Sequence, residues 1–156
     1  ADYDNDGDQD LYVANDYGKN CLYRNHNGHF SDVADAAEVI DFGSGMSVDW
    51  ADYDRDGHID LYVGNMFSTA GGRITSQAAF LPDAEGDQRS IYARFAKGNT
   101  LFRNRGDGHF ADVGAATGVE HARWAWSSVF ADINNDGWED LLVANGYVTG
   151  DDIDDL

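Results

Sequence analysis

The sequence predicts an all-β fold made of consecutive four-stranded antiparallel blades, part of a β-propeller. An acidic loop followed by an apolar segment occurs three times, beginning at Asp2, Asp52 and Asp132. A pair of short strand-like segments around a turn rich in Asn and Gly occurs twice, at 20–33 and 99–113. The first two acidic loops begin about 50 residues apart, which is a normal length for a four-stranded blade.

Each repeat contains four strand-like segments in a fixed order. One segment precedes the acidic loop, one follows it, and the last two form a hairpin. We expect strands at 10–15, 21–25, 29–33, 46–51, 59–64, 99–103, 109–113, 126–131 and 139–145. Recurring aromatic side chains on these strands are expected to form the core between neighbouring sheets: Tyr12, Trp50, Tyr62, Trp126 and Phe130.

The repeats divide the chain into pieces of one propeller. Residues 1–45 are predicted to form a partial blade, 46–113 a full blade and 114–156 a second partial blade. Three blades are too few to close a ring, so we expect the chain to be a segment of a longer protein. Residues 66–97 interrupt the full blade as an insertion, and inserted loops often carry partner contacts. Its charged residues are candidate contacts: Arg73, Asp83, Glu85, Asp87 and Arg94.

The three acidic loops have the residue pattern of calcium-binding loops. Side chains bearing oxygen stand at loop positions 1, 3, 5 and 9, and Gly stands at position 6, where the chain bends sharply. The predicted side-chain ligands are Asp2, Asp4, Asp6 and Asp10 in the first loop, Asp52, Asp54, Asp56 and Asp60 in the second, and Asp132, Asn134, Asp136 and Asp140 in the third. The predicted main-chain carbonyl ligands at position 7 are those of Asp8, His58 and Trp138. The expected cofactor is Ca²⁺, with up to three ions.

A helix–loop–helix calcium hand is the main rival interpretation of these loops. It requires a bidentate Glu at position 12, where this chain has Val13, Val63 and Val143. Solvated turns without an ion are a second alternative. We expect the ions to be structural, because a catalytic metal keeps open coordination positions and a nearby base. Asn134 removes one formal charge from the third loop, which is expected to bind calcium more weakly.

Composition restricts the classes of partner. The hydrophobic content of 42% indicates a globular chain, but the net charge is −19 with only 10 Lys and Arg, so nucleic acid is not an expected partner. No apolar run is long enough to predict membrane insertion. Low-affinity calcium loops suit the millimolar calcium found outside the cytosol, so we expect an extracellular, cell-surface or periplasmic location.

The acidic loops and hairpin segments resemble the FG-GAP/VCBS repeat family, the calcium-binding propeller blades also found in integrin α-subunits. Segments 65–68, 73–75, 99–104 and 126–132 look more narrowly like the repeats of ASPIC/UnbV-type secreted proteins. The resemblance implies a seven-bladed propeller in the parent protein, a surface or secreted location, and a role in adhesion or protein binding.

No nucleophile elbow, phosphate loop or zinc-binding pattern is present, so the chain is not expected to be an enzyme. We expect a non-catalytic recognition, adhesion or scaffold module that binds a protein or glycan ligand at the cell surface. Two alternatives stay open. One is a structural subunit that self-assembles through open sheet edges into a filament or surface layer. The other is a polysaccharide-acting enzyme, which would need a deep pocket with Arg or carboxylates outside the loops.

Overall fold

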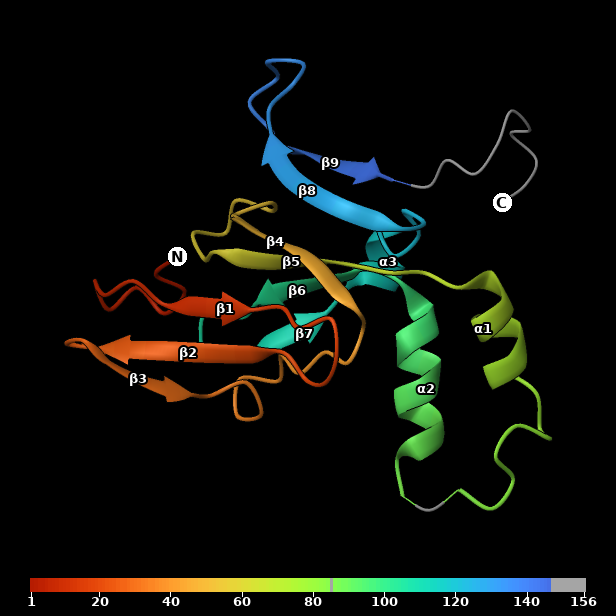
Figure 1. Ribbon diagram of the computed structural model, residues 1–156. Helices are drawn as coiled ribbons and strands as arrows, with labels where there is room; N and C mark the ends of the chain where they lie inside the picture. Colours follow the sequence, from red (N-terminus) through yellow and green to blue (C-terminus); the bar gives the residue numbers. More distant parts are fainter. Residues whose placement is uncertain (85, 147–156) are drawn as a thin grey trace.

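The structure, a computed structural model, describes residues 1–84 and 86–146 and contains three antiparallel sheets (Figure 1). The first sheet has the order β1 (Leu11–Val13), β2 (Cys21–His26), β3 (His29–Asp32). The second has the order β4 (Gly45–Ala51), β5 (Asp60–Asn65), β6 (Thr100–Asn104), β7 (Phe110–Asp112). The third pairs β8 (Ala125–Ala131) with β9 (Asp140–Asn145).

The predicted antiparallel β-structure is confirmed. Each expected strand is present within a few residues of its predicted bounds, although β1 is only three residues long where 10–15 was expected. Over the described residues the three sheets do not close a ring. Their assignment as blades of one propeller, with the boundaries given above, stays a prediction, and residues 147–156 of the last partial blade lie outside the described residues.

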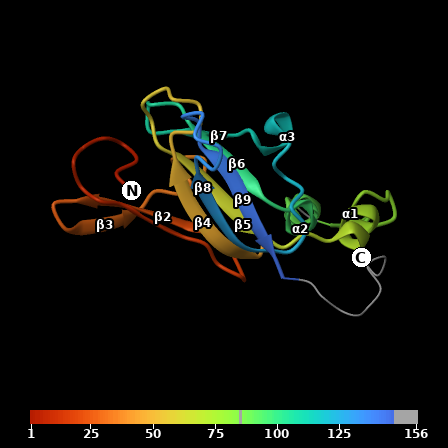
Figure 2. The same ribbon diagram turned by 90° about the horizontal axis from the view of Figure 1, so that it is seen from above.

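The prediction of an all-β fold is wrong for the insertion. Residues 66–97 contain two helices, α1 (Thr69–Thr75) and α2 (Gln88–Lys97), and a third short helix, α3 (Gly114–Thr117), follows β7. Ser68 begins α1 as its N-cap, because its side chain accepts a hydrogen bond from the Gly71 amide at 3.0 Å. The two insertion helices pack against each other and extend away from the sheets (Figures 1 and 2).

The second sheet lies between the other two (Figure 1). All six residues of its strand β5 are buried, because core residues of the first sheet pack on one face and β8 covers the other. The same aromatic contact occurs at both junctions. Tyr12 meets Trp50 edge-on at 6.3 Å between ring centroids, and Tyr62 meets Phe130 in the same way at 6.1 Å. These four residues therefore have the inter-sheet role predicted for them, whereas Trp126 is 46% exposed.

Polar contacts also join the second and third sheets. The Asp49 carboxylate accepts a hydrogen bond from the Phe130 amide at 2.6 Å. The hydroxyl oxygens of Ser47 and Ser128 lie 2.8 Å apart.

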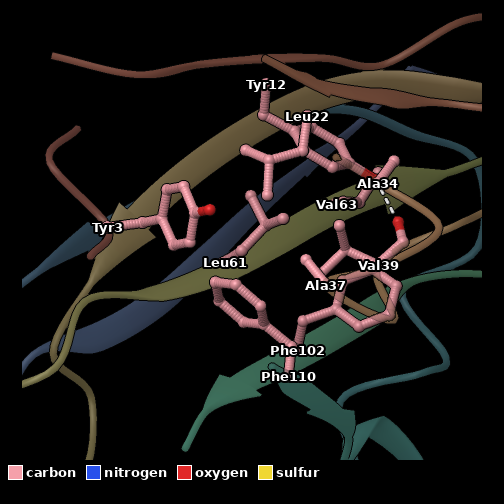
Figure 3. Packing of buried hydrophobic residues seen from close by; sticks show 10 residues of the cluster. All are labelled: Tyr3, Tyr12, Leu22, Ala34, Ala37, Val39, Leu61, Val63, Phe102 and Phe110. Atoms are coloured by element: carbon pink, nitrogen blue, oxygen red, sulfur yellow. Dashed lines mark hydrogen bonds between the residues drawn. The ribbon is translucent and has the colours of Figure 1, made fainter. Parts of the chain in front are cut away.

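The main apolar core lies between the first and second sheets (Figure 3). Strand residues supply most of it, and the segment after β3 closes one side. Its buried members are Tyr3, Tyr12, Leu22, Ala34, Ala37, Val39, Leu61, Val63, Phe102 and Phe110. The Tyr12 hydroxyl donates a hydrogen bond to the Val39 carbonyl at 3.0 Å, so the one polar atom of this side chain is satisfied within the core.

An ion pair anchors α2 to the sheets. Arg94 donates from Nε to Asp41 Oδ1 at 2.9 Å and from Nη1 to Asp112 Oδ2 at 3.0 Å. Thr100 donates its hydroxyl hydrogen to Asp41 Oδ2 at 2.6 Å. Burial alone would raise the pKa of Asp41, but the Arg94 guanidinium and these hydrogen bonds hold it below its usual value. Arg94, a candidate partner contact by sequence, is therefore structural. No helix among the described residues is long and apolar enough to cross a membrane.

Candidate calcium-binding loops

The three acidic loops lie at the same end of their sheets (Figure 1) and share one internal hydrogen-bond pattern. In each, the carboxylate at position 1 accepts hydrogen bonds from the main-chain amides of positions 5 and 6. For Asp52 these come from Asp56 and Gly57, both at 3.0 Å. The corresponding distances are 3.1 and 2.9 Å for Asp2, and 3.1 and 2.8 Å for Asp132. The loop is therefore wrapped around its first carboxylate.

The backbone turns at two positions in each loop. Position 6 has positive φ, for example +88° at Gly57, as the bend inferred from the sequence requires. Position 4 is also left-handed, with φ of +58° at Asn5, +60° at Arg55 and +59° at Asn135. Asn tolerates this conformation better than most residues, so its presence in two of the three loops was a local signal that the sequence analysis missed.

The carboxylates at positions 5 and 9 hold the ends of the loop. Position 5 accepts the amide of position 7, for example His58 N to Asp56 Oδ1 at 3.0 Å. Position 9 lies at the start of the following strand. Asp60 is fully buried there and accepts the amides of Tyr53 and Asn104, at 3.2 and 2.7 Å. Asp10 accepts those of Tyr3 and Asn25 in the same way, at 3.0 and 2.8 Å. Position 9 therefore ties the loop to the next strand of its sheet, β2 in the first sheet and β6 in the second.

The structure brings part of each predicted ligand set together. Asp2, Asp4 and Asp6 in the first loop, and Asp52, Asp54 and Asp60 in the second, each offer oxygen atoms within 4.8 Å of one another. Two oxygens bound to one Ca²⁺ lie at most about 5 Å apart, given Ca–O distances of about 2.3–2.6 Å. Both groups therefore fit a hard cation.

Other predicted ligands are arranged differently. Asp10 and Asp56 lie outside these two groups. The Asp8 side chain accepts the Asn27 amide at 2.7 Å and forms a further group with Asp6 and His26. The carbonyl role assigned to Asp8, His58 and Trp138 stays a prediction.

In the third loop, within the described part of the chain, no three carboxylates approach so closely. Asn134 takes a place in its hydrogen-bond pattern, because its side-chain oxygen accepts the Asp136 amide at 2.8 Å. Asp140 accepts the Ile133 amide at 3.3 Å. Hydrogen bonds from the Trp138 amide and, to a smaller extent, from the Asn134 side chain lower the pKa of Asp136.

The second loop has two features that the sequence analysis did not assign to it. Arg103 on β6 donates from Nε to Asp54 Oδ2 at 2.6 Å and from Nη2 to Asp56 Oδ2 at 2.9 Å. Asp54 Oδ1 is buried and has no hydrogen-bond partner. A buried carboxylate oxygen without a donor is costly unless a cation or water binds it, so this atom supports a metal site.

The electrostatics of the first two loops reflect their crowded carboxylates. Burial, with further contributions from Asp54 and Asp56, raises the pKa of Asp60 to about 7. Burial and the neighbouring charges of Asp6 and Asp10 raise the pKa of Asp4. A divalent cation would relieve the like-charge repulsion in both places.

The second and third loops also contact each other. The Arg55 guanidinium lies 4.3 Å from the ring centroid of Trp138, within the range of a cation–π interaction. The position 4 side chain of one loop therefore touches the position 7 side chain of the next.

The FG-GAP-like repeat matches the chain twice, over residues 2–63 and 83–143. The matches include all three acidic loops and most of the described strands. The chain therefore belongs to the FG-GAP-like repeat family. A search of curated proteins returns no significant match. The narrower likeness to ASPIC/UnbV-type repeats stays a prediction.

Proposed function

We propose that this chain is a non-catalytic, calcium-binding recognition or adhesion module of an extracellular protein. The observation that carries the proposal is the recurrence of one carboxylate-wrapped loop on three neighbouring sheets, with convergent oxygens in the first two. Membership of a repeat family that is typical of extracellular proteins and generally non-catalytic supports it. Asp, Asn and main-chain oxygens are the hard ligands that Ca²⁺ prefers.

The proposed role of calcium is to join the strands on either side of each loop. The carboxylates of one loop repel one another when no cation is present, and the net charge of −19 adds a repulsion spread over the whole chain. Three Ca²⁺ ions would reduce that charge to −13. Binding to the folded state alone stabilises it by mass action.

Calcium is expected to raise the melting temperature, and chelation to lower it. Extracellular loops bind with Kd on the order of 10⁻⁴–10⁻³ M, so free calcium at about one to ten times Kd contributes about 1–4 kcal/mol over three sites. Calorimetry in calcium and in chelator measures the shift. Asp52→Ala should remove part of it, whereas Asp16→Asn, an exposed acid outside the loops, should not. Asn134→Asp should enlarge it. A melting temperature that responds to neither calcium nor chelator would contradict the assignment.

We place the partner surface on the insertion. Helix α1 has no buried residue, and Ile74 and Tyr92 are each about half exposed. A groove of about 320 Å³ lies between the helices, with Phe67, Thr75 and His121 in its lining. Its lining contains no Asp, Glu or Arg, so it lacks the groups that would favour a polysaccharide-acting enzyme. Arg73, Asp83 and Asp87 stay candidate contacts, and Glu85 lies outside the described residues.

Substitutions on the helices test this surface better than deletion of 66–97, which would also remove Arg94 from Asp41. We expect the double variant Ile74→Ser/Tyr92→Ser to lose at least 10-fold in binding to an immobilised panel of glycans and matrix proteins in calcium. Tyr17→Ser, which changes an 88% exposed residue away from the insertion, is the matched control. Equal binding by both variants would exclude the insertion as the partner surface.

A self-assembling structural subunit is the second candidate. Apolar side chains are exposed on the two outermost sheets, with Leu11 and Phe30 on the first and Val129 and Leu142 on the third. Their positions suit contact between two copies of the chain. The same panel therefore includes the immobilised chain itself. Binding to it that persists in the Ile74→Ser/Tyr92→Ser variant would favour this function.

A further inference from the structure

Arg103 joins two carboxylates of the second loop. Its guanidinium reaches Asp54 and Asp56 through different nitrogens, and each contact is within hydrogen-bonding distance. Arg presents its donors in a rigid planar fork, so one side chain can bridge two carboxylates in a fixed geometry. Arg103 lies on β6, 49 residues along the chain from Asp54, so the contact depends on the pairing of β5 with β6.

The arginine and a metal ion would use different oxygen atoms. Arg103 binds the Oδ2 atoms of Asp54 and Asp56. Asp56 Oδ1 accepts the His58 amide, and Asp54 Oδ1 is the buried atom without a partner. Asp54 is also a member of the convergent group with Asp52 and Asp60. Arg103 therefore leaves an Asp54 oxygen for an ion while it neutralises charge beside it.

The first loop has the same four side-chain ligands and no such cation. Arg24 occupies the position in the first repeat that Arg103 occupies in the second. Among the described residues it forms no ion pair with Asp4 or Asp6, and Asp4 Oδ1 accepts the Asp6 amide at 3.3 Å instead. Two loops with the same four side-chain ligands thus differ in whether a guanidinium bridges the carboxylates at positions 3 and 5. The other arginine of the second loop, Arg55, lies against Trp138 of the third loop instead.

We propose that Arg103 is a positioning residue and internal counter-ion that tunes the second calcium site. The inference rests on the proposed calcium-binding function. Without calcium, Arg103 offsets the repulsion between Asp54 and Asp56 and holds the loop in its folded form. With calcium bound, the guanidinium charge repels the ion across a few ångströms. The second site is therefore more stable when empty and binds calcium more weakly than the first.

The effect of Arg103 on calcium affinity is measured in variants that keep only one intact calcium loop. Asp2→Ala with Asp132→Ala leaves only the second loop intact, and Asp52→Ala with Asp132→Ala leaves only the first. Arg103→Met, which keeps a long apolar side chain and removes the charge, is added to the first background. Arg24→Met is added to the second background as the matched control. Calcium is titrated calorimetrically, and the melting temperature is measured in chelator.

We expect Arg103→Met to lower the calcium Kd of the second loop roughly 10-fold, a moderate effect because Arg103 is 45% exposed. It should also lower the melting temperature in chelator. Arg24→Met should change the Kd of the first loop less than about 2-fold. Arg103→Lys keeps the charge without the planar fork, and its Kd should stay nearer to that of the unchanged loop.

A purely structural role for Arg103 predicts the opposite sign, because a disordered loop would bind calcium more weakly. An unchanged or raised Kd in Arg103→Met would therefore overturn the tuning role while leaving calcium binding itself in place. Absence of calcium binding in both backgrounds and in the unsubstituted chain would overturn the proposed function and this inference together.

Discussion

Arg94→Met is expected to lower the free energy of unfolding by about 3 kcal/mol, within the range for breaking one side of a buried ion pair. The Asp41 side chain is fully buried, and the Arg94 side chain is 17% exposed. Asp41 would keep neutral donors, among them Thr100 and the Gly43 amide, which holds the loss near the lower end of that range. Chemical denaturation monitored by circular dichroism measures it.

The difference in free energy of unfolding between Arg94→Met and the unsubstituted protein should become smaller at acidic pH. The pKa of Asp41 is below 3.8 in the folded state, so the stability that its ionisation provides is present above that pH and is lost as pH falls through the folded value. Without Arg94, burial raises the pKa of Asp41 instead. Protonation of Asp41 then removes the unpaired buried charge that destabilises the variant.

Arg89→Met on the same helix is the control, because the Arg89 guanidinium is exposed and donates to the Gln77 carbonyl. Arg89→Met should lower the free energy of unfolding by less than about 0.5 kcal/mol. Asp41→Asn combined with Arg94→Met should recover part of the loss by removing the unpaired charge. A loss below about 1 kcal/mol in Arg94→Met would show that the pair does not anchor α2.

Phe110→Ala is expected to lower the free energy of unfolding by about 3–5 kcal/mol, and Phe30→Ala by less than about 0.5 kcal/mol. The two residues occupy the same place in the repeat, after Gly-His. Phe110 is 1% exposed and lies in the core with its ring 5.7 Å from that of Tyr3, whereas Phe30 is 55% exposed. Urea denaturation of both variants, at low protein concentration to prevent self-association, makes the comparison. Equal losses of unfolding free energy in the two variants would contradict the prediction that only Phe110 is a core residue.

The sequence repeats predicted the strands and loops well because the interactions that shape them are local. The Asp52 carboxylate binds amides four and five residues ahead, and the Asp60 carboxylate binds one seven residues back. Such bonds depend only on spacing, so a repeated spacing gives a repeated loop. The left-handed residue Arg55 shows the limit of this reasoning, because Arg carries no strong turn preference.

Features that depend on distant segments could not be predicted in this way. The insertion has no second copy with which to compare it, and its helices were missed. Arg94 and Asp41 are 53 residues apart, and nothing in their local sequence indicates that they meet. Phe110 is buried because residues of the first repeat, such as Tyr3, pack against it, whereas Phe30 is exposed, although both follow the same dipeptide.

The junction between the second and third sheets combines an aromatic contact with two directional polar contacts, which differ in how they resist sliding of one sheet over the other. An edge-on aromatic pair such as Tyr62 and Phe130 sets the spacing of two surfaces but allows them to slide. The bond from the Phe130 amide to Asp49 and the contact between Ser47 and Ser128 have directional requirements, so sliding or rotation would break them. A force applied along the strands would therefore be carried by these polar contacts before the aromatic rings moved apart.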